Sequence, residues 1–169
     1  MQAPGGTSGT ASPSAEGRAL LLVALAAAMA LATAFALEHL GGYAPCSLCV
    51  YERWPWAAAL IVALAGKLLG RPRPALLIVG LLLLGNAALS AYHVGVEAGW
   101  FALPGTCAAG GGATTLEELR AQLEAARPTC DRVALRVLGL SLAAWNGIAA
   151  AAVAAFAALA FVRARRLSS

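Results

Sequence analysis

Long stretches without a charged residue constrain the fold of this chain more than any other feature. Residues 19–37, 74–96 and 137–162 are uncharged and mostly apolar. A helix needs about 20 such residues to cross the hydrocarbon core of a bilayer. Only 12% of the 169 residues are charged and 60% are hydrophobic, whereas soluble domains carry about 25% charged residues. The sequence therefore predicts an all-α membrane protein.

A fourth apolar stretch, 54–66, is too short to span a bilayer by itself. It lengthens to about 17 residues if Lys67 extends its ammonium group to the membrane surface. It reaches about 20 residues if the helix begins near Pro45, because proline is well suited to the first turn of a helix. Both alternatives give a four-transmembrane-helix bundle and place three reactive side chains at the membrane boundary: Cys46, Cys49 and Arg53.

The length allows one domain and no second domain of ordinary size. We expect a disordered cytoplasmic tail at 1–17, which is rich in small and polar residues, and a single transmembrane domain at 18–166. The predicted spans are 19–38, 47–66, 74–93 and 140–162, and the predicted loops on the outer side are 39–46 and 94–136. The triplet Ala34-Phe35-Ala36 resembles a signal-peptidase site, but the apolar run before it exceeds the roughly 7–15 residues of the apolar region of a signal peptide.

Lysine and arginine are distributed unequally between the connections. The connections on one side carry Arg18, Lys67, Arg71, Arg73, Arg163, Arg165 and Arg166. Because cytoplasmic connections carry an excess of positive charge, both termini are expected in the cytoplasm, and all four cysteines then face the oxidising outer side. The basic residues form short clusters between apolar runs, so we expect a lipid bilayer and no nucleic acid as partner.

The outer loop 94–136 contains a glycine run followed by a helical pattern. The segment "TTLEELRAQLEAAR" places Leu116, Leu119 and Leu123 at helical spacing, and Thr115 and Glu118 have the spacing of a capping box. We expect a short amphipathic helix that lies on the bilayer surface or packs on the bundle. It separates Cys107 from Cys130.

The pair Cys46-x-x-Cys49 is compatible with three kinds of site. It can be a redox dithiol, half of a zinc site or a structural pair. A zinc site needs further ligands, which Cys107 and Cys130 could supply, although their wide separation is unlike that of compact structural sites. A disulfide between positions so close in sequence closes a very small ring and removes little chain entropy. The spacing therefore favours thiol–disulfide exchange over stapling.

The redox interpretation also explains an arginine at the membrane boundary. A helix that begins near Pro45 places both thiols at its positive end, which lowers thiol pKa values, and Cys46, Cys49 and Arg53 then share one helical face. A dithiol at this depth can pass two electrons to a quinone dissolved in the bilayer. Arg53 is expected to bind a quinone oxygen and stabilise a thiolate, and His93 is expected to add a second polar contact.

Several segments resemble the disulfide bond formation protein B family of bacterial inner-membrane thiol:quinone oxidoreductases. They are "PCSLCVYER", "YHVGVEAGW", "LPGTC", a later "CD" and "LGLSLAAWN", in family order and with all four cysteines included. A vitamin K epoxide reductase-like oxidase is a weaker match, because its Cys-x-x-Cys pair lies near the last helix. A non-enzymatic membrane protein with structural disulfides or zinc is the alternative from another class.

The resemblance implies a path for electrons. Cys107, disulfide-bonded to Cys130, would react with a periplasmic thioredoxin-fold oxidase, disulfide bond formation protein A. Cys46 would then form an interloop disulfide with Cys130, and Cys49 would face ubiquinone or menaquinone from the membrane pool as a thiolate. The resemblance gives Arg53 and His93 the same quinone-site roles as the residue pattern does. It implies catalytic roles for all four cysteines and a multi-pass location in the inner membrane.

Overall fold

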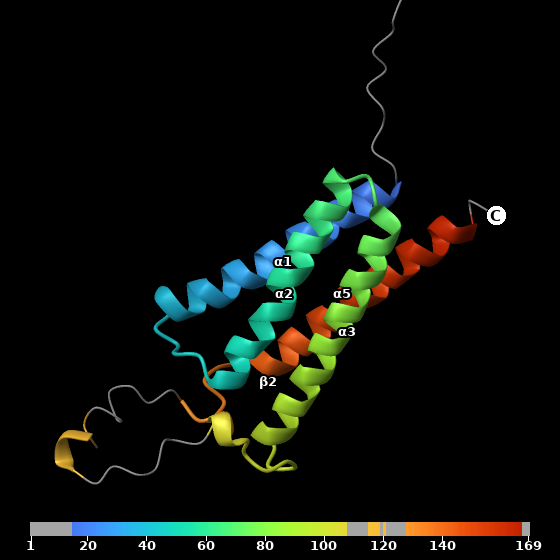
Figure 1. Ribbon diagram of the computed structural model, residues 1–169. Helices are drawn as coiled ribbons and strands as arrows, with labels where there is room; N and C mark the ends of the chain where they lie inside the picture. Colours follow the sequence, from blue (N-terminus) through green and yellow to red (C-terminus); the bar gives the residue numbers. More distant parts are fainter. Residues whose placement is uncertain (1–14, 108–114, 119, 121–127, 167–169) are drawn as a thin grey trace, which may run out of the picture.

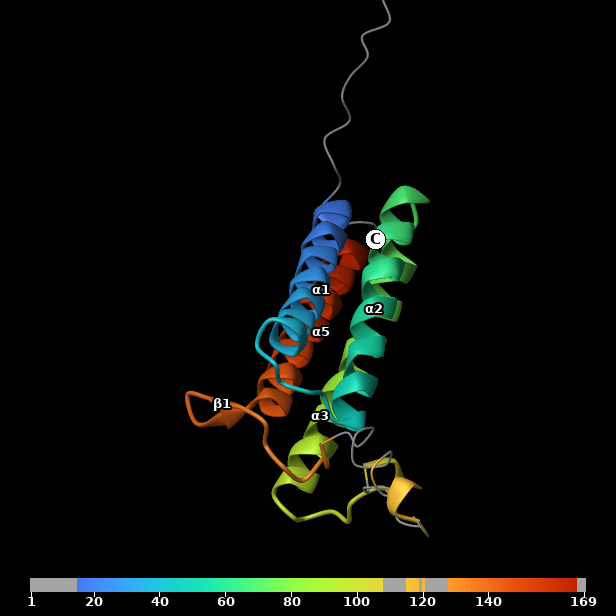
Figure 2. The ribbon, with the colours of Figure 1, turned by 90° about the vertical axis from the view of Figure 1, so that its left-hand side faces the viewer.

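Four long helices make up most of the computed structural model, which describes residues 15–107, 115–118, 120 and 128–166. They are α1 (Ala15–His39), α2 (Ser47–Leu68), α3 (Pro72–Glu97) and α5 (Leu142–Arg166), and they run side by side in Figures 1 and 2. Each is long and apolar enough to cross a membrane. The prediction of an all-α, four-helix membrane protein is confirmed.

The outer surface of the bundle is apolar, as a lipid-facing surface requires. Leu22, Leu25, Ile61 and Leu81 are among the large side chains that point away from the core. In hydrocarbon the backbone polar groups must bond within the chain, and a helix satisfies them internally. Alanine and leucine, which dominate these segments, also have the highest helix propensities.

Small residues bring the helices close together in the core. Ala27, Ala59 and Ala150 are completely buried, and small side chains of this kind let helix backbones approach closely in membranes. A Cβ atom added at Gly66 would lie only 2.2 Å from the Cβ atom of Ala75. Glycine is therefore required where α2 meets the start of α3.

The start of α1 and the end of α5 lie at one end of the bundle, and the start of α2 lies at the other (Figure 1). The predicted tail is wrong at its last three residues, because α1 begins at Ala15. Glu16 favours this early start, since an acidic side chain interacts well with the positive end of a helix. Glu16 also accepts a 2.9 Å hydrogen bond from Nε of Arg73. Residues 1–14 of the predicted tail lie outside the described residues.

Helix α2 begins at Ser47 with Cys46 as its N-cap. Of the two starts considered for this helix, the one near Pro45 therefore agrees with the structure. Helix α3 continues to Glu97, beyond the segment expected to lie within the membrane.

The fourth predicted span begins two residues too early. Residues 140–141 belong to a short antiparallel hairpin, in which β1 (Arg136–Val137) pairs with β2 (Leu140–Ser141). The turn between the strands has positive φ at Leu138 (52°) and Gly139 (84°), as a tight hairpin turn requires. Helix α5 starts directly after it, where Ser141 Oγ accepts a 3.2 Å bond from the backbone N–H of Ala144.

The predicted amphipathic helix is described only at its beginning. Residues 116–118 are helical. The capping box is present: the backbone N–H of Glu118 donates to Thr115 Oγ1 (3.2 Å), and that of Thr115 donates to Glu118 Oε2 (3.3 Å). Most of the expected helix, including Leu119 and Leu123, lies outside the described residues.

Candidate active site

The first turn of α2 brings two thiols into contact. The Sγ atoms of Cys46 and Cys49 lie 2.6 Å apart, and Cys46 Sγ also accepts a 3.2 Å bond from the backbone N–H of Cys49. Both cysteines are free, with Cys46 buried and Cys49 half-buried. Because three positions along a helix bring side chains together, this pair can open and close as a disulfide with little backbone movement.

The surroundings of Cys46 favour its thiolate. The hydrogen bond with the Cys49 thiol, assisted by His93 and opposed by burial, lowers the pKa of Cys46 from an ordinary value of 9.0 to about 4. The thiolate is the nucleophilic form of cysteine and the better leaving group in exchange. Cys46 is therefore prepared for thiol–disulfide chemistry.

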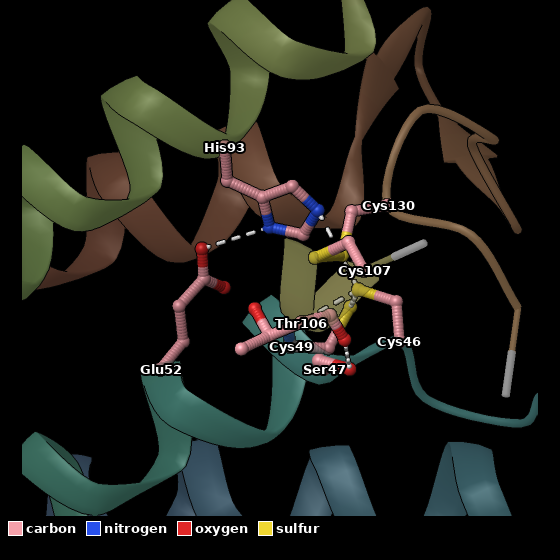
Figure 3. The surroundings of a disulfide bond; sticks show 8 residues. All are labelled: Cys46, Ser47, Cys49, Glu52, His93, Thr106, Cys107 and Cys130. Atoms are coloured by element: carbon pink, nitrogen blue, oxygen red, sulfur yellow. Dashed lines mark hydrogen bonds and ion pairs between the residues drawn. A yellow bond between two sulfur atoms is a disulfide. The ribbon is translucent and has the colours of Figure 1, made fainter. Parts of the chain in front are cut away.

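A histidine and a carboxylate lie in line behind Cys46 (Figure 3). His93 Nε2 is 3.6 Å from Cys46 Sγ, and His93 Nδ1 is 3.0 Å from Glu52 Oε1. His93 is 2% exposed and Glu52 is 5% exposed. A carboxylate that is hydrogen-bonded to one ring nitrogen orients the imidazole. It also determines which of the two ring nitrogens carries a hydrogen. The pair therefore aims Nε2 at the Cys46 sulfur.

A second set of hydrogen bonds holds Glu52 from the opposite side. Asn146 Nδ2 donates to Glu52 Oε2 (3.1 Å) and to Ser90 Oγ (2.8 Å), and Asn146 Oδ1 accepts from Trp56 Nε1 (2.7 Å). Among the described residues, every buried side-chain nitrogen and oxygen has a partner. Fully satisfied buried networks are rigid, so the Glu52 carboxylate is held in one orientation.

A cavity of about 280 Å³ lies between α1, α2 and α5. Its mostly apolar wall includes Ala30, Leu31, Leu37 and Ala149, and its polar residues include Cys49, Glu52 and Arg53 from α2 and Asn146 from α5. An apolar cavity with a few convergent polar groups is the usual form of a small-molecule site.

Arg53 is held at this cavity by α1. Its Nη1 donates to Glu38 Oε2 at 2.5 Å, and its guanidinium lies over the Phe35 ring, 5.0 Å from the centroid. These contacts stabilise a cation near the membrane boundary. Arg53 and Cys49 both line this cavity.

A smaller cavity of about 40 Å³ also borders Cys49. Cys46, His93, Glu97 and Arg132 line it, together with Cys49. Cys49 therefore borders both cavities, whereas the structure places His93 with Cys46 on the side of the smaller one.

The loop disulfide joins Cys107 to Cys130, with their Cα atoms 5.4 Å apart. Both sulfurs are buried in one cluster with Cys46, Leu48 and Val96, and Figure 3 shows them next to Cys46. Ser47 Oγ donates to the carbonyl of Thr106 at 2.7 Å, which ties the residue before Cys107 to the first turn of α2. All four sulfurs are thus gathered at one end of the bundle.

Two thiols and one imidazole form a potential metal site. A ligand atom of each of Cys46, Cys49 and His93 lies within 4.8 Å of the other two, and these are donors that Zn²⁺ accepts. The other two ligands of the zinc site considered from sequence are Cys107 and Cys130, which are joined to each other instead.

The structure brings together the six residues selected from the sequence, but in two groups. Cys49 and Arg53 share the larger cavity, and His93 contacts Cys46 beside the loop disulfide. Sequence reasoning missed Glu38, Glu52 and Asn146. The signal for Glu52 was available, because a carboxylate inside an apolar span is rare unless it is functional.

The comparisons with known proteins point to one family. The family model described as "Disulfide bond formation protein DsbB" matches residues 16–160. A protein of Rickettsia prowazekii (strain Madrid E), described as "Uncharacterized protein RP370", is 27% identical over 124 residues, which are 70% of this chain and 72% of that protein. No solved structure matches the chain.

Proposed function

The chain belongs to the disulfide bond formation protein DsbB family, and on that premise we propose that it is a membrane thiol:quinone oxidoreductase. One observation carries the proposal: Cys49 shares an apolar cavity with Arg53 and contacts Cys46, which packs against a second cysteine pair. This arrangement suits a relay between a protein dithiol and a membrane-soluble acceptor.

The larger cavity fits the head group of a quinone. Its volume of about 280 Å³ is close to the lower end of ligand pockets, about 300 Å³, and its apolar wall suits a flat ring. The Arg53 guanidinium can donate to a ring oxygen, because it is always charged and carries several donors. A ubiquinone or menaquinone bound there would supply a two-electron acceptor, and Cys49 is the cysteine that lines the cavity.

The two cysteine pairs then act in sequence. A reduced thioredoxin-fold oxidase, disulfide bond formation protein A, attacks Cys107 and is itself oxidised, which leaves Cys107 and Cys130 as thiols. Exchange through a Cys46–Cys130 disulfide passes the electrons to the pair on α2. Their contact in one buried cluster supports this step, because exchange requires direct attack of sulfur on sulfur.

The proposed setting is the bacterial inner membrane, with both termini in the cytoplasm and the cysteines in the periplasm. The positive charges around the helical ends opposite the cysteines support this orientation. Oxidised cysteines are also stable in the periplasm, unlike in the cytosol.

Anaerobic turnover of the full chain in detergent tests the proposal. The reaction contains the reduced thioredoxin-fold oxidase and either a ubiquinone or a menaquinone analogue. We expect one quinol for each partner dithiol oxidised. A partner that stays reduced with both analogues would contradict the proposal.

The three-donor cluster of Cys46, Cys49 and His93 favours a zinc protein as the second candidate. The same turnover assay, repeated after treatment with a chelator, distinguishes the two. An oxidoreductase retains its rate, whereas a zinc protein shows no turnover and releases stoichiometric metal.

A further inference from the structure

Glu52 lies between the thiol side and the cavity side of the site. Its Oε1 is 3.0 Å from His93 Nδ1, its Oε2 accepts from Asn146, and the residue lines the larger cavity together with Cys49. The atoms therefore form a continuous chain from Cys46 Sγ through the two nitrogens of His93 to a carboxylate at the cavity wall (Figure 3).

We propose that His93 and Glu52 carry the proton of Cys46 to the larger cavity, and that Asn146 positions the Glu52 carboxylate for this transfer. The inference rests on the proposed function, because the cavity needs protons only if a quinone is reduced there. It gives His93 a role on the thiol side of the site, in place of the quinone contact expected from the sequence.

The step balances in electrons and protons. When Cys46 and Cys49 form their disulfide, one S–S bond forms, the S–H bond of Cys49 breaks, and the pair gives up two electrons; the second proton is the one that Cys46 lost when it became a thiolate. Both electrons and both protons pass to the quinone, which becomes quinol. Cys49 borders the cavity directly and releases its proton there. Because the thiolate is the favoured form of Cys46, its proton has already moved from Sγ to His93 Nε2 before the disulfide forms. When the disulfide forms, His93 Nδ1 gives a proton to Glu52 Oε1, and Nε2 keeps the proton that came from Cys46.

A purely structural role for the buried His93–Glu52 pair would cost much hydration free energy. A buried carboxylate and imidazole lose several kcal/mol of hydration each, and apolar residues of similar volume often replace such pairs without loss of stability. Ionisable groups within membrane spans generally mark ion or proton paths. A protein-bound path also retains the proton at a site that water reaches poorly.

Other charged groups lie near Cys46, His93 and Glu52, so the tests below need a control for their charge. Glu97 and Arg132 line the smaller cavity with Cys46 and His93, and Arg53 stands on the wall of the larger one, paired with Glu38. Glu97 is the matched control, because it adds a carboxylate on the Cys46 side but lies outside the chain of contacts from sulfur to cavity.

The first test uses quinone-free, pre-reduced full chain that carries Cys107→Ser and Cys130→Ser. The ultraviolet absorbance of the thiolate is followed against pH in this background and with Glu52→Gln, Glu52→Asp or Glu97→Gln added. Glu52→Gln removes the carboxylate that is bonded to His93, so we expect the midpoint of the Cys46 titration to rise by at least about one pH unit. At a pH below the midpoint, this is a tenfold loss of thiolate. Glu52→Asp should recover part of the shift, and Glu97→Gln should leave the midpoint unchanged. An unchanged midpoint in Glu52→Gln would overturn the coupling.

The second test measures quinol formation in a single anaerobic turnover with all four cysteines present. We expect Glu52→Gln and Glu52→Ala to be at least tenfold slower than wild type, as is typical when a positioned proton carrier is lost. Formate should restore much of the rate in Glu52→Ala, where space is left for it, and little in Glu52→Gln. A merely structural glutamate would give no such rescue.

The outcomes separate the relay from the function on which it rests. A wild type that reduces no quinone overturns both. A wild type that reduces quinone, beside a Glu52→Gln variant with the wild-type rate and midpoint, overturns the relay alone. Should Glu52→Gln fail to fold, His93→Gln tests the relay at the residue that contacts Cys46. Slow quinol formation and a raised thiolate midpoint support the relay, and wild-type values of both overturn it.

Discussion

The two cysteine pairs touch each other but have different surroundings. Cys107 and Cys130 form a closed disulfide packed against Leu48 and Val96. Cys46 and Cys49 are free thiols at a helix N-terminus, with an imidazole bonded to one sulfur and a cavity beside the other. The loop pair lies in an apolar cluster, whereas the helix pair has groups that stabilise charge.

This difference gives the proposed relay its direction. Stabilising a thiolate stabilises the reduced form of a pair, so its disulfide becomes more oxidising. The lowered pKa of Cys46, about 4, therefore favours electron flow from the loop pair to the helix pair. It also makes Cys46 a good leaving group when a Cys46–Cys130 disulfide is resolved.

Serine substitutions in the two pairs should separate the two half-reactions, and we expect these effects to be the largest. Cys49→Ser should abolish quinone reduction, because no sulfur then faces the cavity, while the loop disulfide still exchanges with the partner. Cys107→Ser should abolish partner oxidation but leave the reduced helix pair able to reduce quinone. Stopped-flow quinol formation and trapping of the mixed disulfide with the partner measure the two reactions. Loss of both reactions in each variant would remove the distinction between the pairs.

Arg53 should influence the helix pair and leave the loop pair unaffected. Arg53→Gln is expected to lower kcat/KM for quinone by about 10–100-fold, the effect of losing about 1.5–3 kcal/mol from a charge-assisted hydrogen bond. Exchange between partner and loop disulfide should be unchanged.

The ion pair with Glu38 complicates Arg53→Gln, since the substitution also removes a cationic partner of the Glu38 carboxylate. A double-mutant cycle with Glu38→Gln separates the two effects. Arg73→Gln is the control, because its exposed pair with Glu16 lies at the opposite end of the bundle and should matter little. A wild-type kcat/KM in both Arg53→Gln and the double variant would contradict the assigned role.

The charge on Cys46 should appear in the pH dependence of stability. Its pKa in the folded, reduced protein lies below its ordinary value of 9.0, so the unfolded chain binds more protons between about pH 4 and 9. The contribution is therefore complete above about pH 9 and is lost as the pH falls through about 4. Subtracting the unfolding free energies of Cys46→Ser from those of the reduced wild type isolates it, and a flat difference would contradict it.

Cys49→Ala tests the cause of the lowered pKa. The Cys49 thiol makes the largest contribution, so its loss should raise the Cys46 midpoint by at least about one unit, a tenfold loss of thiolate. A midpoint that stays near 4 would assign the shift to His93 instead.

The contact between the two regions gives the smallest expected effect. Ser47→Ala removes the hydrogen bond to the carbonyl of Thr106, worth about 0.5–1.5 kcal/mol, so exchange between the pairs should change by up to about tenfold. Ser141→Ala is the control, because it removes a cap of α5 away from the sulfurs. Equal exchange rates in wild type and Ser47→Ala would show that this contact does not position the loop.

Features that depend on local sequence were predictable. Uncharged stretches revealed three spans directly, because hydrocarbon excludes charge over a fixed length, and Pro45 indicated where the fourth, α2, starts. The Thr115 and Glu118 capping box followed from spacing alone. The hairpin before α5 was missed because "VLGL" reads as part of an apolar run, and its positive φ at Leu138 lacks the usual glycine or asparagine.

The polar network of the site depends on how the helices rotate against one another. Glu52 and Arg53 are adjacent in sequence, yet one points to α3 and α5 and the other to α1. Periodicity does not reveal which helix lies beside each face when all faces are apolar. The partners of His93 and Asn146 therefore became visible only once the bundle was assembled.

A thiol count on pre-reduced protein tests the central claim most directly. The purified chain, with all four cysteines reduced and the reductant removed, receives excess quinone under anaerobic conditions without any partner. We predict that all four thiols disappear and that two quinols form for each chain. Four persisting thiols and no quinol would contradict it.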